Sequence, residues 1–355
     1  MTKKPLWAII TAVLSLLTIY MFFGQSGLSI SEFVEDIQEA NFWWLIPAAF
    51  CMILYIWFEG TALTRISRAL GYPVKKRRGF LYASADIYFS SITPSATGGQ
   101  PASAYFMRKD GISTSVATAA LILNVTMYTL AIVTIGVFCV VFFPRLFWQF
   151  PVGSKVMIIF GILAMFCLTS LLIILLKKHQ ILFKAGETII AILKKLHFRA
   201  VAVRMEAKLQ DSIEKYKECV SQLAGKKTLL VRIYFLNLMQ RVVQILVTVF
   251  VYFALHGSYS EGLMVFIIQS YVIIGSNFIP VPGAVGVSEY IMFCGFSMLA
   301  SSDLAGSLSL VSRGITFYTC SIISIFTVVL GYITIKMSEI NKKRLSEKTK
   351  SGDSL

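Results

Sequence analysis

Two Pro- and Gly-rich stretches interrupt long apolar segments of this chain, one in each half of the sequence. The first covers residues 91–101 (SITPSATGGQP), and the second covers residues 277–289 (NFIPVPGAVGVSE). A backbone that opens within a bilayer leaves N–H and C=O groups unpaired unless protein or a wet cavity surrounds it. A pair of such interruptions in the two halves of a membrane chain is typical of a transport site.

The surrounding sequence is apolar enough to favour an integral membrane protein over a soluble enzyme. Hydrophobic residues make up 56% of the chain, and the mean hydropathy is +0.73. Continuous spans, each near the ~20 residues that cross a bilayer, are predicted at residues 6–23, 42–63, 115–143, 156–176, 229–255 and 308–335. We expect residues 6–23 to be a retained first helix, because no small-residue cleavage site follows them.

The positive charge is concentrated between the spans. Of 33 Lys and Arg residues, 29 fall in residues 1–5, 64–79, 108–109, 177–232 and 336–355. The positive-inside rule places all five segments, and therefore both termini, in the cytoplasm. The net charge of +15 thus indicates contact with an anionic inner leaflet rather than with nucleic acid.

The same rule predicts how the two interrupted stretches are folded. If residues 80–107 crossed the membrane once, the basic residues at 108–109 and 177–232 would lie outside. A single crossing by residues 261–300 would likewise place the basic C-terminal tail outside. Both stretches are therefore expected to be re-entrant hairpins, the first entering from the cytoplasm and the second from outside. The predicted fold is an all-α polytopic membrane protein with about six spanning helices and two oppositely oriented hairpins.

We expect one transmembrane domain over residues 1–340. Its basic cytoplasmic loop, residues 177–228, carries apolar residues at helical spacing between positions 205 and 223. That helix could lie on the inner leaflet or pack against other cytoplasmic loops. Residues 341–355 are charged and polar, which predicts a disordered cytoplasmic tail.

Charged residues inside apolar spans are costly, so each is a candidate site. Asn237, Arg241 and Gln244 fall on one face of an otherwise apolar helix, and Arg313 lies within the last span. A guanidinium can form two parallel hydrogen bonds to a phosphate, which suits a phospholipid headgroup. The alternative for either arginine is a structural pair with a buried carboxylate.

Three carboxylates are placed within or beside the apolar spans. Asp86 lies inside the first predicted hairpin, and Glu289 follows the second Pro- and Gly-rich stretch. Either could pair with an arginine, bind a cationic headgroup or take up a proton during transport. Glu59 is close to Arg65 in sequence, and we expect it mainly to extend toward the membrane interface.

The two interruptions also supply bare backbone at which an anion could bind. The residues concerned are Thr97, Gly98, Gly99 and Gln100 in the first and Pro282, Gly283 and Gly286 in the second. Alternatively, these residues only form the hairpin turns. The sequence contains no nucleophile elbow, P-loop, HExxH motif, CxxC motif or Cys/His cluster, so we expect no catalytic residue, no metal site and no cofactor.

The two motifs resemble a known family. Asp86, then TPSATGGQP at 93–101 and RKDGIS at 108–113, and later PVPGAVGVSE at 280–289, are similar to the lysylphosphatidylglycerol synthase transmembrane-region family. That family includes the flippase-like membrane part of the multiple peptide resistance factor, which moves aminoacylated phosphatidylglycerol to the outer leaflet and thereby gives resistance to antimicrobial peptides. Its lysyl transfer resides in a soluble domain that we do not expect in this chain.

The resemblance implies a lipid flippase of the cell membrane. Its partner would be a phospholipid, such as an aminoacyl-phosphatidylglycerol, or a polyprenyl-linked lipid. One alternative is a phosphatidylglycerol lysyltransferase, or its membrane subunit, that uses lysyl-tRNA. Another is a membrane scaffold that transports nothing. A homo-oligomer is compatible with each of these functions.

Overall fold

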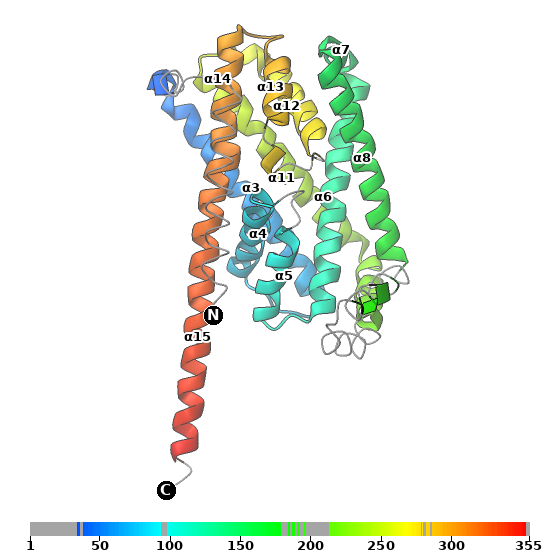
Figure 1. Cartoon of the computed structure of the whole chain (residues 1–355), viewed down its shortest axis with the longest axis vertical. Helices are drawn as coiled ribbons and strands as arrows, with labels where there is room; N and C mark the ends of the chain where they lie inside the picture. The colour runs from blue at the N-terminus through cyan, green and yellow to red at the C-terminus, as the bar shows by residue number, and fades with distance from the viewer. Residues whose placement is uncertain are drawn as a thin grey trace.

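The computed structural model describes residues 38–93, 98–178, 213–277 and 286–352. It also describes short pieces at 34–35, within 184–195, at 279 and at 282–284. The predicted first span at residues 6–23 lies outside this part of the chain, as does Thr97. Every regular element among the described residues is a helix (Figure 1).

Six helices in the described part are long and apolar enough to cross a membrane. They are Phe42–Ala69, Thr114–Phe142, Val152–Lys177, Lys227–Ala254, Tyr259–Ser276 and Ser302–Ile340. Five of them coincide with predicted spans, whereas Tyr259–Ser276 belongs to the second predicted hairpin. The expected all-α polytopic membrane architecture is confirmed.

Four long helices form the frame around the two interrupted stretches (Figure 1). They are α3 (Phe42–Ala69), α6 (Thr114–Phe142), α8 (Val152–Lys177) and α11 (Lys227–Ala254), and the short α7 (Pro144–Gln149) connects α6 to α8. The Asn41 side chain accepts a hydrogen bond from the Trp43 amide at the start of α3, and Ser113 caps α6 in the same way. Helix α11 packs along α3 over most of its length.

The first interrupted stretch forms an antiparallel pair, α4 (Lys76–Ser91) and α5 (Gly99–Lys109). Asp110, which follows α5, accepts from Arg78 Nη2 at 2.6 Å and from the Tyr82 hydroxyl at 2.5 Å, and both donors lie early in α4. The two outer ends of the pair are therefore joined, and the chain enters and leaves on the same side of the bundle.

The second interrupted stretch forms another antiparallel pair, α12 (Gly262–Ser276) and α13 (Val287–Phe296). Gly275 near the end of α12 packs on Ile291 of α13, and Gly295 near the end of α13 packs on Ile268 of α12. Figure 1 shows α12 and α13 toward the upper end of the helical bundle and α4 and α5 below them, toward its lower end. The two hairpins thus enter the bundle from opposite ends.

The last segment is one long run of helix with an altered turn. Helix α14 (Ser302–Arg313) passes into a π-helical stretch, Gly314–Thr319, and then into α15 (Cys320–Gly352). Helix therefore continues over residues 341–352, where the sequence predicted a disordered tail. Residues 342–348 are mostly Lys, Arg, Leu and Glu, which favour helix, and they extend a helix that has already formed.

Apolar side chains cover the outside of the bundle. Ile159, Leu163 and Phe166 on α8 are each about half exposed, as expected of a surface that faces lipid. Inside, small residues let the helices approach closely. A Cβ added to Gly161 would lie 2.0 Å from the carbonyl oxygen of Ile274 on α12.

The structure describes part of the helix that was predicted between positions 205 and 223 of the basic loop. Residues 213–224 are helical, and Tyr216, Cys219 and Leu223 are buried in the same cluster as Val74 and Ile112 of the bundle. This end of the predicted amphipathic helix therefore packs on the protein. Burial raises the pKa of Tyr216 to about 12.

Candidate functional site

Arg241 lies near the middle of α11 and is 1% exposed. Its guanidinium is held between two aromatic rings, 4.8 Å from the centroid of Tyr55 on α3 and 4.3 Å from that of Tyr128 on α6. Nη2 donates to the Tyr55 hydroxyl at 2.6 Å, and Nη1 donates to Gln244 Oε1 at 2.7 Å. Nε is buried and has no hydrogen-bond partner.

Arg241 forms no ion pair with any carboxylate in the described part of the chain. The sequence also allowed Arg241 to form a structural ion pair with a buried carboxylate. No such ion pair occurs among the described residues. An unpaired guanidinium within a membrane helix is costly, and its planar donors match an anionic ligand.

The predicted polar face of α11 points into the bundle. Asn237 is fully buried and donates to Asn124 Oδ1 of α6 at 3.2 Å, so it bonds across to a neighbouring helix rather than to Arg241. Gln244 accepts from Arg241, as described above. The sequence periodicity thus located the interior face correctly, although it did not reveal that two tyrosines hold the guanidinium.

The first interruption is built around Asp86 on α4, which is 7% exposed. Gln100 Nε2 on α5 donates to Asp86 Oδ2 at 2.6 Å, and the Ser90 hydroxyl donates to Oδ1 at 3.2 Å. A Cβ added to Gly99 would lie 2.0 Å from Asp86 Oδ1, so glycine is needed for this close approach. The Gly98 amide donates to the Thr93 hydroxyl at 2.9 Å.

Glu59 corrects an expectation from the sequence. It does not extend toward the interface beside Arg65 but lies inside the bundle, 6% exposed. Gln240 Nε2 of α11 donates to Glu59 Oε2 at 2.8 Å, and the carboxyl group of Glu59 lies close enough to that of Asp86 to interact with it. One signal could have indicated this, because Glu59 is four residues after Tyr55 and so shares its face of α3.

The second interruption is closed by an ion pair. Arg313 Nε donates to Glu289 Oε1 at 2.9 Å, and Arg313 Nη2 donates to the Gly283 carbonyl at 2.5 Å. Glu289 Oε2 accepts from the Gly286 amide at 2.7 Å and from the Ser288 hydroxyl at 2.9 Å. Arg313 and Glu289 therefore bind each other and the loop, which satisfies most of their hydrogen-bonding capacity.

The loop itself needs residues that tolerate a left-handed backbone. Gly283 and Gly286 have φ of +62° and +84°, and Ala284 has φ of +53°. Pro282 begins this short turn, which contacts α4 of the other hairpin. The tip of the second hairpin therefore lies against α4 of the first.

Tyr128 connects the second interruption to Arg241. Its hydroxyl donates to Oδ1 of Asn277, at the end of α12, at 3.2 Å, and it accepts from Arg241 Nη1 at 3.5 Å. Nearby on the last helix, a Cβ added to Gly314 would meet no atom within 4 Å. This glycine begins the π-helical stretch, and such stretches often occur at functional sites.

The interior thus holds two adjoining sets of polar side chains. One is a cation with aromatic and amide partners, and the other is a pair of carboxyl groups with amide and hydroxyl donors. The first can bind an anion such as a phosphate, and the second can bind an amine or a proton. Within the described residues, no cluster of three His, Cys, Asp or Glu side chains is arranged to hold a metal ion.

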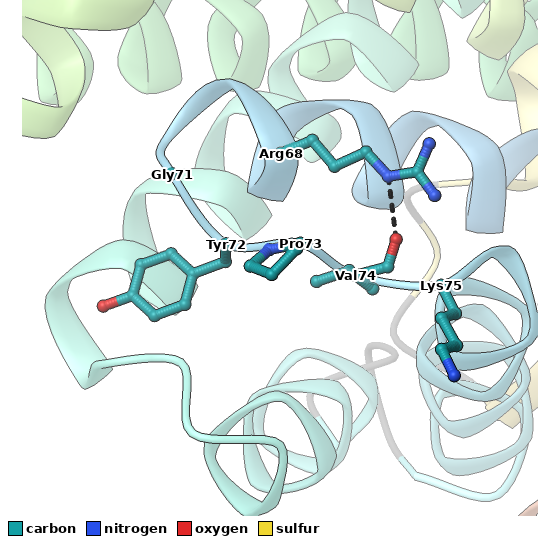
Figure 2. A pocket seen from close by; sticks show the side chains of 6 residues that line it. All are labelled: Arg68, Gly71, Tyr72, Pro73, Val74 and Lys75. Carbon is teal, nitrogen blue, oxygen red and sulfur yellow. Dashed lines mark hydrogen bonds between the residues drawn. The ribbon is translucent and has the colours of Figure 1, made fainter.

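A separate cavity of about 400 Å³ lies at the surface where α3 connects to α4. Figure 2 shows its lining residues, among which the exposed Arg68 donates from Nε to the Val74 carbonyl at 2.8 Å. Arg68 is thirteen residues after Tyr55 on the same helix, or about 20 Å along its axis at ~1.5 Å per residue. The cavity is therefore distinct from the interior site around Arg241.

Comparison with known families identifies the family of this chain. A sequence profile of the family described as the lysylphosphatidylglycerol synthase TM region matches residues 7–324, and the chain belongs to this family. Comparisons with curated proteins and with solved structures found no match. The protein is thus a multi-pass membrane protein of a family connected with lysylphosphatidylglycerol synthesis or flipping.

Proposed function

We propose that this protein moves a phospholipid headgroup between the leaflets of a membrane while the acyl chains stay in the bilayer. The observation that carries the proposal is Arg241, a buried guanidinium held by two tyrosines and a glutamine without a carboxylate partner in the described residues. Paired N–H donors match phosphate oxygens. A charge inside a membrane protein commonly marks the path of a ligand or an ion.

The lipid that fits best is an aminoacylated phosphatidylglycerol, because it carries both a phosphate and an amine. Arg241 would bind the phosphate, and the acidic groups around Asp86 would face the amine. The family description, which names lysylphosphatidylglycerol, supports this class of lipid. A polyprenyl-linked lipid would share the phosphate contact but would leave the carboxyl groups without a cationic partner.

The two oppositely oriented hairpins support an alternating-access route. The tip of the second hairpin contacts α4 of the first, and the two enter the bundle from opposite ends, so a small movement of one pair would change which side reaches Arg241. In this proposal Arg313 and Glu289 hold the second hairpin closed. The π-helical stretch after Arg313 and the open space at Gly314 would give the last helix room to move.

We further propose that the protein resides in the cell membrane with both termini and residues 177–228 in the cytoplasm. The basic segments support this orientation through the positive-inside rule. A cysteine introduced at the exposed Lys195 should resist an impermeant thiol reagent in intact cells and react after permeabilisation. Ready labelling in intact cells would show that the orientation is the opposite of the one proposed.

The test is a leaflet-resolved assay with purified protein in proteoliposomes. Lysylphosphatidylglycerol is placed in the inner leaflet, and its amine is detected from outside with an impermeant amine reagent. The wild-type protein and an Arg232→Met variant should expose the lipid, because Arg232 is an exposed cation on the same helix. An Arg241→Met variant should not. Equal exposure in empty liposomes and in all protein samples would contradict the proposal.

A second function is favoured by one finding, since the family description names a synthase. In that case the chain, alone or as a membrane subunit, would transfer lysine from lysyl-tRNA to phosphatidylglycerol. We expect no product when purified protein is incubated with lysyl-tRNA and phosphatidylglycerol. Robust formation of lysylphosphatidylglycerol would favour the enzyme. A protein whose interior polar residues are all dispensable would instead be a scaffold.

A further inference from the structure

Glu59 and Asp86 form a carboxyl pair that the proposed lipid contacts at Arg241 do not require. The two residues come from α3 and α4, they are 6% and 7% exposed, and their carboxyl groups lie close enough to interact with each other. An ionised carboxylate can only accept hydrogen bonds. Two buried carboxyl groups that lie side by side are therefore stable only when a proton is held by one of them.

The other oxygens of the pair are bonded to neutral donors. Gln240 binds Glu59, while Gln100 and Ser90 bind Asp86. Neither carboxyl forms an ion pair within the described part of the chain. Two neighbouring carboxylates that are buried without a paired cation do not both ionise, so one proton is retained.

The charge of the surroundings agrees with a single shared proton. Arg241 follows Gln240 on α11 and lies close enough to interact electrostatically with Glu59, although its hydrogen bonds go to Tyr55 and Gln244. With one proton the pair carries one negative charge, which balances the single guanidinium. The other titratable groups that face this region are Tyr55 of α3, Tyr128 of α6 and Cys320 of α15.

The pair also connects the first hairpin to the frame. Helices α3 and α4 are in close contact, since a Cβ added to Gly60 would lie 2.8 Å from the backbone of Gly79. Asp86 is in turn bound by Gln100 at the start of α5. Loss of the shared proton would place two like charges side by side between α3 and α4, which would push the hairpin away from the frame.

We propose that Glu59 and Asp86 form a proton-binding site, and that proton exchange there drives the movement of the first hairpin during lipid translocation. The coupling to lipid rests on the function proposed above, whereas proton binding by the pair does not. In the step itself one O–H bond breaks, the proton passes to water on one side of the membrane, and the pair becomes doubly negative. Reprotonation from the other side restores the single negative charge of the pair.

Infrared spectroscopy of the full-length protein in lipid vesicles tests proton binding without any transport. A protonated carboxyl absorbs at a frequency distinct from that of a carboxylate and shifts in D₂O. At neutral pH we expect such a band in the wild-type protein, and its loss in Glu59→Gln and in Asp86→Asn. Glu339→Gln, which changes an exposed carboxylate paired with Lys109, should retain the band. A band that persists in both pair variants, or is absent from the wild-type protein, would overturn the proposal.

Proteoliposomes with an imposed proton gradient test the coupling. The wild-type rate of lysylphosphatidylglycerol exposure should change with the direction of the gradient. The double variant Glu59→Gln/Asp86→Asn pairs two neutral amides in place of the shared proton, so it should fold. Its exposure rate should fall, because Asp86 faces the amine in the proposed function, and it should no longer depend on the direction of the gradient. Gradient-independent exposure by the wild-type protein would refute the coupling. If the infrared band is present but no lipid moves in any sample, the proposed lipid function fails while the proton site stands.

Discussion

Replacing Arg241 with methionine separates a ligand-binding arginine from a structural one. Methionine is also long and unbranched, so it fills much of the space between the Tyr55 and Tyr128 rings. The change removes two short hydrogen bonds, to the Tyr55 hydroxyl at 2.6 Å and to Gln244 at 2.7 Å, and a long one to the Tyr128 hydroxyl at 3.5 Å. It also removes a buried charge that forms no ion pair with a carboxylate in the described residues.

The expected effect on stability is modest because these changes oppose each other. Two hydrogen bonds to a charged group contribute about 1.5–3 kcal/mol each, or about 3–6 kcal/mol together. Removing a charge from the bilayer centre recovers about 2.5–3.5 kcal/mol on insertion scales. The variant should therefore lose about 0–3 kcal/mol, which leaves a typical protein folded. Lipid translocation, in contrast, should be lost.

The assay pairs thermal unfolding of purified protein with lipid exposure in proteoliposomes. Arg232→Met is the matched control, because it removes the same charge from an exposed position of α11. Arg241→Lys adds a further test, since a lysine keeps the charge but lacks the planar fork, and it should restore little translocation. Full translocation by Arg241→Met would refute the reasoning. Failure of that variant to insert or fold would show that the arginine is structural.

Three further predictions follow from other parts of the structure. Arg313→Gln should lower the free energy of unfolding by about 1–3 kcal/mol because it leaves the partly buried Glu289 without its cation, and the Arg313→Gln/Glu289→Gln double variant should unfold at a higher temperature than that single variant. Gly161→Ala should cost about 1–3 kcal/mol because its Cβ would overlap the backbone of α12, whereas Gly314→Ala, which meets no atom within 4 Å, should leave Tm nearly unchanged. The tyrosinate absorbance of Tyr216, measured as the difference between the wild-type protein and Tyr216→Phe, should rise with a midpoint near pH 12. The stability that comes from packing of the neutral phenol is therefore complete below pH 10 and is lost toward pH 12. A midpoint near pH 10 would show that Tyr216 is exposed.

The architecture was largely readable from the sequence because its determinants are local. Pro and Gly mark where a membrane helix must open, and the positions of Lys and Arg limit how the chain can cross. The interior face of α11 was also readable, because Asn237, Arg241 and Gln244 recur at helical spacing. Each of these signals lies within one element or at its ends.

The side-chain partners were not readable, since they depend on contacts between distant elements. Glu59 lies beside Arg65 in sequence, yet packing of α3 against α11 and α4 places its carboxyl next to Gln240 and Asp86. The pair of Arg313 with Glu289 depends on a loop with left-handed residues, which the sequence only outlines. The interpretation of residues 341–352 as disordered rested on composition and missed a helix that continues from the last span.

The central claim is that a phosphate headgroup reaches Arg241 inside the bundle, and crosslinking tests it most directly. A lysylphosphatidylglycerol analogue with a photoreactive group beside its phosphate is activated in vesicles that hold the purified protein, and the attached peptides are identified. The account predicts attachment to the interior faces that surround Arg241, including Tyr55 and Tyr128, and its loss in Arg241→Met but not in Arg232→Met. Attachment confined to the outward-facing residues of α8, and unchanged in both variants, would contradict it.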